Sequence, residues 1–253
     1  MFANIVFMAF FAKDDLSCLM LIVSLVSHGH GEMVSRLAEA LLEYPEVQRV
    51  VVTQNIEEGE GLPPSESFIL QRNVRPKGYG ANQNAAFSIS ENTFFCVLNP
   101  DIHIKTNPFP ELLASFSNPK VALVAPKIIT PEGQVEDSVR KFPTFRSLAC
   151  KAFGGSNGTY SELNSSPDWV GGMFMLFRSD VFREIGGFDE KFFLYYEDVD
   201  ICWRLRQRGY EIKFVPSVEV IHDARRESRK NWRYARWHLV SMARYLIKAK
   251  AWW

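Results

Sequence analysis

The feature that most constrains the fold is a repeated alternation of apolar strands and amphipathic helices in the first hundred residues. Leu19–Val26 (LMLIVSLV) is an uninterrupted apolar run, which is typical of a parallel strand covered on both faces. Met33–Leu42 follows with apolar residues at helical spacing. The next predicted elements are strands at Val47–Thr53 and Phe68–Gln71, a helix at Gly78–Ser88 and a strand at Phe94–Leu98. This order predicts a doubly wound α/β sheet flanked by helices.

The second half of the chain continues the same pattern without a repeat or a boundary that indicates a second domain. The predicted elements are strands at Val121–Ile129, Trp169–Phe177, Glu211–Val215 and Val218–Ile221, and helices at Ser179–Ile185 and Glu197–Arg208. Residues Asp137–Pro167 form a long polar connection between these elements. Such connections often serve as lids or binding loops, so we expect this one to shape a binding site.

Residues 225–253 are predicted to form a basic amphipathic helix. Ala224–Trp253 holds nine Lys or Arg and one Glu, whereas the whole chain has a formal net charge of zero. A neutral chain gives no reason to expect nucleic acid as a partner. The helix has the composition of one that contacts an anionic membrane surface, and a helix packed on the domain with a solvated basic face is the alternative.

The first 18 residues are predicted to be an N-terminal extension. Their apolar run of about a dozen residues is too short to span a bilayer and lacks the basic flank of a signal peptide. A packed extension and a membrane-surface anchor both stay open. No segment has 18 uninterrupted apolar residues, so no transmembrane helix is predicted. The four cysteines are far apart in the sequence, which favours reduced thiols in a cytoplasmic protein.

Polar residues follow the predicted strands where each strand ends. In doubly wound sheets, ligands bind outside the carboxyl ends of the strands. The residues expected at this edge are His28, Gln54, Asn55, Asn99 and Asp101. Asp101 follows Asn-Pro directly after a buried strand, and a carboxylate there suits Mg²⁺ or Mn²⁺, which take one or two protein carboxylates plus phosphate oxygens. An ordinary Asx turn is the alternative for this sequence.

A second group of acids lies among bulky apolar residues late in the chain. Glu197 and Asp198 fall in the first turn of a predicted helix, shortly after the apolar run Phe192–Tyr195. A carboxylate at the mouth of an apolar pocket can act as a general base toward a hydroxyl group. The alternative is helix-start charge with an Asp200–Arg204 pair at i,i+4.

Two weaker features complete the candidate site. His222 ends an apolar strand and becomes a plausible ligand only if a carboxylate holds a divalent ion beside it. The turn GYGANQNAAF, which begins at Gly78, fits neither common phosphate-binding glycine pattern, so its glycines allow close approach of a nucleotide or only local packing.

Together these segments resemble the inverting family 2 glycosyltransferases of the GT-A fold, and most closely their bacterial rhamnosyltransferase-type branch. The resemblance runs from about Leu19 to about Lys250. Its strongest parts are LNPD at 98–101, WVGGMFMLFR at 169–178, GGFDEKFFLYYEDVDICWRLRQRGY at 186–210 and VEVIH at 218–222. It implies one GT-A domain over 19–224, with a Rossmann-like mixed sheet and a C-terminal helix.

The resemblance also implies roles for individual residues. Asp101 and His222 match the metal- and diphosphate-contacting positions, and Asp198 matches the catalytic base, with Glu197 beside it. Asp189 matches a position near the sugars. Further substrate-binding candidates are His28, Gln54, Asn55, Gly78, Asn82, Asn99, Trp169, Gly171, Gly172, Arg225 and Arg226.

The implied activity is transfer of a sugar from a nucleotide sugar to a saccharide or polyprenyl-linked acceptor, in cell-surface polysaccharide synthesis. Mg²⁺ or Mn²⁺ is the implied cofactor, dTDP-rhamnose is a candidate donor, and the implied location is the cytoplasm or the inner face of the cell membrane. Asn99 replaces the first acid of the family's metal motif, and Gln54 stands where many members hold the base with Asp. These departures motivate an alternative, a weakly active or inactive sugar-nucleotide-binding protein. A nucleotidyltransferase is disfavoured because SHGHGE, after the first strand, has no Lys or Arg.

Overall fold

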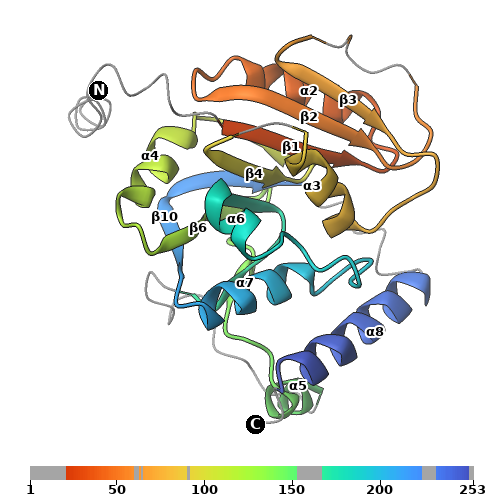
Figure 1. The fold of residues 1–253 in the computed structure, drawn as a ribbon, viewed down its shortest axis with the longest axis vertical. Helices are drawn as coiled ribbons and strands as arrows, with labels where there is room; N and C mark the ends of the chain where they lie inside the picture. Colours follow the sequence, from red (N-terminus) through yellow and green to blue (C-terminus); the bar gives the residue numbers. More distant parts are fainter. Residues whose placement is uncertain are drawn as a thin grey trace.

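The computed structural model describes residues 21–59, 63, 65–89, 92–152, 167–223 and 232–250. Its core is an eight-stranded sheet with the order β3-β2-β1-β4-β9-β6-β10-β5 (Figure 1). The strands are β1 (Leu21–Ser27), β2 (Val47–Gln54), β3 (Phe68–Arg72), β4 (Phe94–Leu98), β5 (Ile102–His103), β6 (Val121–Ile129), β9 (Phe174–Arg178) and β10 (Glu211–His222). The predicted extension, residues 1–18, lies outside the described residues.

Helices cover both faces of this sheet because alternate side chains of each strand point to opposite faces. The helices are α2 (Glu32–Leu42), α3 (Tyr79–Phe87), α4 (Phe109–Ala114), α5 (Phe145–Ala152), α6 (Ser179–Glu184), α7 (Glu197–Gln207) and α8 (Trp232–Lys248), with a 3-10 turn at Ser115–Ser117. Leu21, Val23 and Leu25 of β1 share a core with α2 and α4. Ile22 faces the other core, with α3, α6 and α7.

The sheet is mixed, as expected. Strands β1 to β4 run parallel, whereas β9 lies antiparallel between β4 and β6. One predicted strand, Trp169–Phe177, is wrong as a single element. Trp169–Val170 forms β8, which pairs with β7 (Val139–Arg140) in a separate small sheet, and β9 starts only at Phe174. Gly171 and Gly172 lie between these two strands, where the chain leaves one sheet and enters the other.

Two further boundaries differ from the sequence prediction. The strands predicted at 211–215 and 218–221 are one strand, β10, whose register against β6 shifts between Val215 and Glu219. Pro216 lies inside this shift, and it has no backbone N–H for the ladder. The connection 137–167 is not a plain polar loop, because it contains β7 and α5; its residues 153–166 lie outside the described part of the chain.

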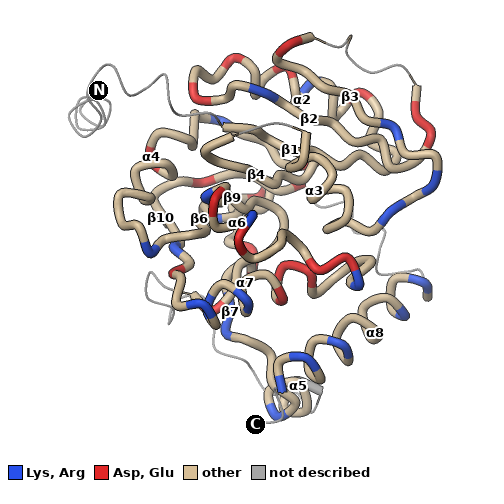
Figure 2. Tube along the Cα trace, viewed as in Figure 1, with Lys and Arg blue, Asp and Glu red and all other residues tan. Residues whose placement is uncertain are grey.

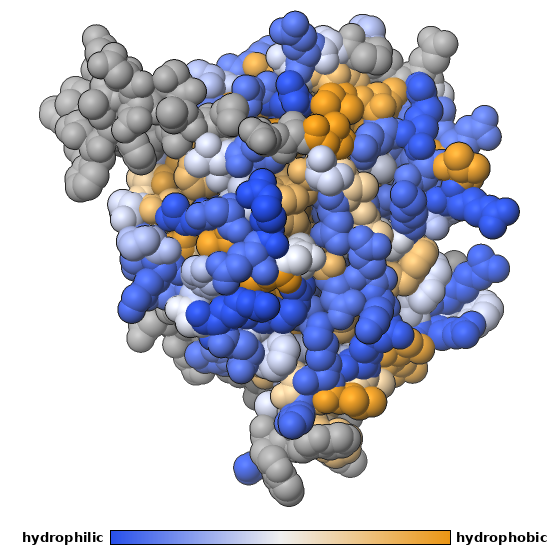
Figure 3. Space-filling view, in the orientation of Figure 1, coloured by the Kyte–Doolittle hydropathy of each residue, from blue (hydrophilic) through white to orange (hydrophobic). Residues whose placement is uncertain are grey.

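Helix α8 packs on the domain through part of its apolar side, where Leu246 is buried and Met242 packs against the same cluster. Its buried residues are Ser241, Tyr245 and Leu246. Three other apolar residues of the helix, Trp232, Leu239 and Ile247, are 69%, 59% and 66% exposed. Figure 3 shows hydrophobic side chains among hydrophilic ones over this helix, at the lower edge of the view. Among the described helices, none combines the length and hydrophobicity that crossing a membrane requires.

Candidate active site

The carboxyl ends of β1, β2 and β4 meet at one edge of the sheet, as predicted. Ser27 pairs with Gln54 at the ends of β1 and β2, and Leu25 pairs with Leu98 in β4. The amide of Asn55 donates to the carbonyl of Ser27 at 2.8 Å. The loops after these three strands therefore line a common rim.

The side-chain amides of Gln54 and Asn55, both on this rim, form hydrogen bonds within the protein. The side-chain nitrogen of Gln54 donates to the carbonyl of Gly59 at 3.1 Å, and its oxygen accepts from Nε of Arg72 at 3.0 Å. Gln54 is also only 4% exposed, so the expectation that it pairs with a nucleotide base is not supported by its position. The Oδ1 of Asn55 accepts from the amide of Lys77 at 2.8 Å, while its Nδ2 lies 3.4 Å from Nδ1 of the exposed His28.

Asn82 and the glycines of α3 have structural reasons for their positions. Asn82 is fully buried and accepts from Asn73 at 2.7 Å, so its side chain has a structural partner, and its contact with substrate stays a prediction. A Cβ on Gly78 would lie 2.8 Å from the carbonyl oxygen of Phe193, and one on Gly80 would lie 2.7 Å from Cβ of Phe188. These glycines let α3 approach the segment before α7, and a contact of Gly78 with substrate stays a prediction.

Asp101 and His222 lie side by side, as the resemblance implied. The amide of Asp223 donates to the carbonyl of Asp101 at 2.9 Å, and His222 pairs with Ile102 across β10 and β5. The Nε2 of His222 lies 3.3 Å from Oδ1 of Asp101, and its Nδ1 lies 2.9 Å from Oε2 of Glu136. Burial raises the pKa of Asp101, but His222 and smaller contributions from a backbone amide and His30 together lower it below its ordinary value. The two carboxylates likewise raise the pKa of His222 against the effect of its burial.

The Asp101–His222 pair fits a divalent cation that is completed by phosphate oxygens. Oδ1 of Asp101 is buried, and apart from Nε2 of His222 at 3.3 Å it has no polar partner among the described residues. Carboxylate and neutral imidazole are both ligands that Mn²⁺ accepts, and Mg²⁺ uses one or two carboxylates plus substrate phosphates. In the described part of the chain, no group of three or more His, Cys, Asp or Glu forms a complete metal site.

Asp198 lies at the start of α7, where Tyr79 links it to the end of β4. The single hydroxyl proton of Tyr79 is shared between two acceptors, Oδ1 of Asn99 at 2.9 Å and the carbonyl of Gly172 at 3.1 Å. The amide of Gly172 donates to Oδ2 of Asp198 at 3.1 Å, and the amide of Val199 donates to its Oδ1 at 2.8 Å. A hydrogen-bonded series therefore runs from the strand end to the acidic helix.

The electrostatics of the acids follow from their burial. Burial and the neighbouring Asp198 raise the pKa of Glu197 well above its usual range. Burial also raises the pKa of Asp198, although the amides of Val199 and Gly172 oppose the shift. Burial and the carboxylates of Glu197, Asp198 and Asp101 raise the pKa of Tyr79, which keeps its hydroxyl protonated as a donor. The hydroxyl of Tyr79 thus lies within the field of both predicted acidic groups.

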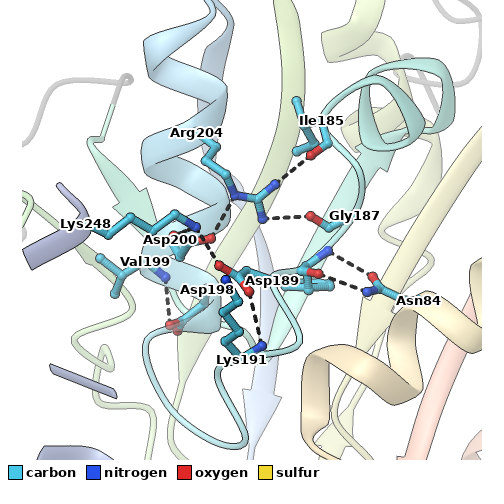
Figure 4. A network of polar contacts seen from close by, with 11 residues as sticks. Asn84, Ile185, Gly187, Asp189, Lys191, Asp198, Val199, Asp200, Arg204 and Lys248 are labelled. Carbon is cyan, nitrogen blue, oxygen red and sulfur yellow. Dashed lines mark hydrogen bonds and ion pairs between the residues drawn. The ribbon is translucent and has the colours of Figure 1, made fainter. Parts of the chain in front are cut away.

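A further ion-pair network holds the segment that carries these acids (Figure 4). The Nζ of Lys248 lies 2.7 Å from Oδ2 of Asp189 and 2.6 Å from Oδ1 of the fully buried Asp200. Arg204 binds the other oxygen of Asp200 at 2.7 Å and donates to the carbonyls of Ile185 and Gly187. The predicted Asp200–Arg204 pair is confirmed. Asp189 has a structural partner, and its contact with sugars stays a prediction.

The C-terminal helix contributes to this network through more than one contact. Ser241 donates to the carbonyl of Leu194 at 3.0 Å, and Trp237 stacks near Phe193 with ring centroids 4.8 Å apart. Figure 2 shows the acidic positions at α7 beside the basic positions of α8. Helix α8 therefore holds the chain that leads into Glu197 and Asp198.

The remaining candidates are Trp169, Gly171, Arg225 and Arg226. Trp169 donates from its indole to the carbonyl of Lys141 at 2.9 Å, and the guanidinium of Arg140 lies 5.3 Å from the centre of the Trp169 ring. A Cβ on Gly171 would lie 2.8 Å from the flexible side chain of Met173 and at an ordinary 3.7 Å from the carbonyl oxygen of Ser138, so packing does not require a glycine here. Arg225 and Arg226 lie outside the described residues.

Three residues in this centre were missed by sequence reasoning. Tyr79 lies within the GYG turn, but nothing in the turn indicates a bridge to Asn99. Glu136 and Lys248 belong to no motif; Glu136 reaches His222, and Lys248 reaches Asp189, from distant parts of the sequence. Contacts at that separation leave no local pattern in one sequence.

Comparison with known proteins decides the family. Residues 94–251 match the model of the glycosyl transferase family group 2. The chain is a family 2 glycosyltransferase. This glycosyltransferase is 28% identical over 259 residues to the rhamnosyltransferase WbbL of Escherichia coli K12, covering 91% of its own chain and 94% of WbbL. It is 32% identical over 139 residues to an N-acetylglucosaminyl-diphospho-decaprenol L-rhamnosyltransferase of Mycobacterium tuberculosis H37Rv, covering 50% of its own chain and 45% of that protein.

Solved structures confirm the GT-A fold of this glycosyltransferase. GalNAc-T7 with UDP, GalNAc and Mn²⁺ matches with a TM-score of 0.65 and 14% identity, over 82% of this chain and 44% of that one. The mannosyltransferase PcManGT of Pyrobaculum calidifontis, with GDP-Man and Mn²⁺, matches with a TM-score of 0.63 and 14% identity, over 90% of this chain and 64% of that one. At this identity the likeness carries the fold alone.

Proposed function

We propose that this glycosyltransferase transfers a sugar from a nucleoside diphosphate sugar to a hydroxyl group of an acceptor, with inversion at the anomeric carbon. The observation that carries the proposal is the hydrogen-bonded series from Asn99 through Tyr79 and Gly172 to Asp198. It ties a carboxylate at the start of α7 to the strand end that carries Asp101. A base and a diphosphate-binding group on one rim suit a single displacement.

Asp198 is the proposed general base. Its raised pKa makes it a stronger base than an ordinary aspartate, and the amides of Gly172 and Val199 hold its two oxygens. The acceptor hydroxyl gives its proton to Asp198 as its oxygen attacks the anomeric carbon. The bond from that carbon to the diphosphate breaks in the same step, and inversion follows. Burial and the charge on Asp198 raise the pKa of Glu197, beside it, which favours the protonated form of Glu197.

Asp101 and Nε2 of His222 are the proposed protein ligands of Mg²⁺ or Mn²⁺. When bound, the cation offsets the negative charge on the diphosphate leaving group. Asn99 is not a proposed direct ligand, because its oxygen accepts a hydrogen bond from Tyr79. The Mn²⁺ in the two structural relatives supports a divalent cation.

The proposed donor is a dTDP-sugar such as dTDP-rhamnose, and the proposed acceptor is a saccharide or a polyprenyl-linked saccharide in cell-surface polysaccharide synthesis. Two rhamnosyltransferases among the relatives support this choice, and one of them is named for a decaprenol-linked acceptor. A lipid-linked acceptor also suits the exposed stripe of Trp232, Leu239 and Ile247 on α8, next to the exposed Arg233 and Arg236. We propose that this stripe lies on the cytoplasmic face of the cell membrane.

The test is hydrolysis and transfer of nucleotide sugars by the purified chain with Mn²⁺. A thermal-shift screen of dTDP-, UDP- and GDP-sugars selects the donor, and NMR of the product gives its anomeric configuration. Wild type should turn over one donor with inversion, and Asp101→Ala should lose at least about 100-fold of the rate, as expected when charge stabilisation of a leaving group is removed. Donor binding without hydrolysis or transfer would instead favour an inactive sugar-nucleotide-binding protein.

A further inference from the structure

Glu136 makes a contact that the proposed reaction does not use. Its Oε2 lies 2.9 Å from Nδ1 of His222, while the opposite ring nitrogen, Nε2, lies 3.3 Å from Asp101. The three side chains are largely buried: Glu136 is 20% exposed, His222 11% and Asp101 12%. Each nitrogen of the imidazole therefore faces its own carboxylate.

The fold delivers Glu136 to this place through a short hairpin after β6. The amide of Thr130 donates to the carbonyl of Gln134 at 2.7 Å, and Gly133 supplies the positive φ of 81° that the turn requires. The chain then runs back beside β6, where the amide of Glu136 donates to the carbonyl of Ile128 at 2.9 Å. Because Ile128 and Ile129 pair with Val220 and Ile221 of β10, Glu136 arrives next to the end of β10.

The chemistry of imidazole gives this arrangement a consequence. A neutral imidazole carries one proton, and only the other nitrogen can bind a metal ion. A carboxylate that accepts from Nδ1–H keeps the proton on that side, orients the ring and increases the basicity of Nε2. The free electron pair of Nε2 is then held toward Asp101.

We propose that Glu136 is the positioning residue that fixes the tautomer and orientation of His222 for a divalent cation shared with Asp101. The inference rests on the cation site of the proposed function, and it is independent of which sugar is transferred. Glu136 is not itself a cation ligand, because it lies at the ring nitrogen opposite to the one that faces Asp101. An acid that merely anchored the hairpin would leave the affinity for the cation unchanged.

The experiment measures binding of Mn²⁺ by calorimetry to the full-length chain, alone and in the presence of dTDP. The variants are Glu136→Ala, which removes the acceptor, and Glu136→Gln, which keeps a neutral acceptor for Nδ1–H. The matched control is Glu219→Gln, which removes a carboxylate three residues before His222 that instead pairs with Lys127 at 2.5 Å. Loss of an outer-shell carboxylate typically weakens metal binding about 10- to 100-fold. We expect that loss for Glu136→Ala, a smaller one for Glu136→Gln, and none for the control.

A second readout reports the tautomer directly. The chain has five histidines, so ¹⁵N NMR of the imidazoles at alkaline pH can resolve them. Wild type should show one histidine protonated on Nδ1, and Glu136→Gln should keep that signal, whereas Glu136→Ala should lose it. If Glu136→Ala does not fold, Glu136→Gln still carries the metal measurement.

The outcomes separate the inference from the proposed function. Wild-type affinity for Mn²⁺ in both Glu136 variants would overturn the positioning role and leave the cation site standing. Absence of Mn²⁺ binding by wild type, even with dTDP, would overturn both the positioning role and the cation site. Weakened binding with the expected loss of the Nδ1–H signal would support the inference.

Discussion

The backbone amide of Gly172 donates a hydrogen bond to Oδ2 of Asp198 at 3.1 Å. This contact joins the crossover between the two sheets to the first turn of α7. The carbonyl of the same residue, Gly172, accepts a hydrogen bond from the hydroxyl of Tyr79. One segment therefore orients the proposed base and ties it to the end of β4, which makes the WVGG motif a positioning element.

The pH dependence of the reaction should reflect the raised pKa of Asp198. A general base must be ionised, so kcat/KM should fall as the pH drops through the pKa of Asp198 in the free enzyme. Because burial raises that pKa, kcat/KM should begin to fall at a pH above the ordinary pKa of an aspartate. A pH–rate profile of donor and acceptor turnover measures it. A flat profile down to the range of an exposed aspartate would contradict the raised pKa.

Glu197→Gln should stabilise the protein at neutral pH. Glu197 is buried, and its Oε2 has no hydrogen-bond partner among the described residues. Because its pKa is raised on folding, the folded state binds more protons than the unfolded state between the two pKa values, and wild-type stability falls as pH rises through that window. The glutamine variant lacks this fall. Above the folded-state pKa of Glu197, its free energy of unfolding should therefore exceed that of wild type by about 1 kcal/mol or more.

Urea unfolding of wild type and Glu197→Gln across a pH series measures this difference. The free energy advantage of the glutamine variant should grow with pH and then level off. A constant difference at all pH values would show that Glu197 does not change its proton affinity on folding.

Lys248→Met should destabilise the fold and reduce turnover. It leaves Asp200, which has 0% exposure, with Arg204 as its remaining cationic partner in the structure, and it frees Asp189. Breaking a buried pair by removing one partner costs about 3 kcal/mol. Arg236→Met, an exposed change on the same helix, should cost less than about 0.5 kcal/mol. Equal unfolding midpoints for the two variants in urea would contradict the role of Lys248.

Helix α8 should bind anionic membranes through its exposed stripe. The double variant Leu239→Glu/Ile247→Glu changes two residues that are 59% and 66% exposed, so it should leave folding intact while placing acids against lipid. Vesicles containing phosphatidylglycerol should sediment with wild type and much less with the variant, and high salt should weaken the wild-type interaction. Equal binding of both proteins would contradict contact through this stripe.

Much of the fold could be predicted from the sequence because strong local patterns set it. Phe94–Leu98 is a continuous apolar run and Val121–Ile129 is apolar except at Pro126 and Lys127, and the structure has strands with those same bounds. The acidic helix start at Glu197 was predictable for the same reason. The failures lie where tertiary contacts override local pattern, as at Gly171–Gly172, where an apolar run divides between two sheets.

The candidate site was predictable only in part. Asp101 and His222 came from motifs, and the structure brings them within 3.3 Å. Gln54 has the chemistry of base recognition, but its donor and acceptor are already used by Gly59 and Arg72, which no single sequence reveals. Tyr79 and Glu136 act through partners distant in the sequence, so only the fold identifies them.

The most direct measurement is the rate of sugar transfer by Asp198→Asn beside Asp180→Asn. Asp180 is a matched control, since it also lies in the first turn of a helix and accepts from the next amide at 2.8 Å, as Asp198 does. Loss of one general base should lower kcat by about 100-fold or more in a folded Asp198→Asn protein, while Asp180→Asn keeps the wild-type rate. A folded Asp198→Asn protein that transfers sugar at nearly the wild-type rate would contradict the role of Asp198 as the base.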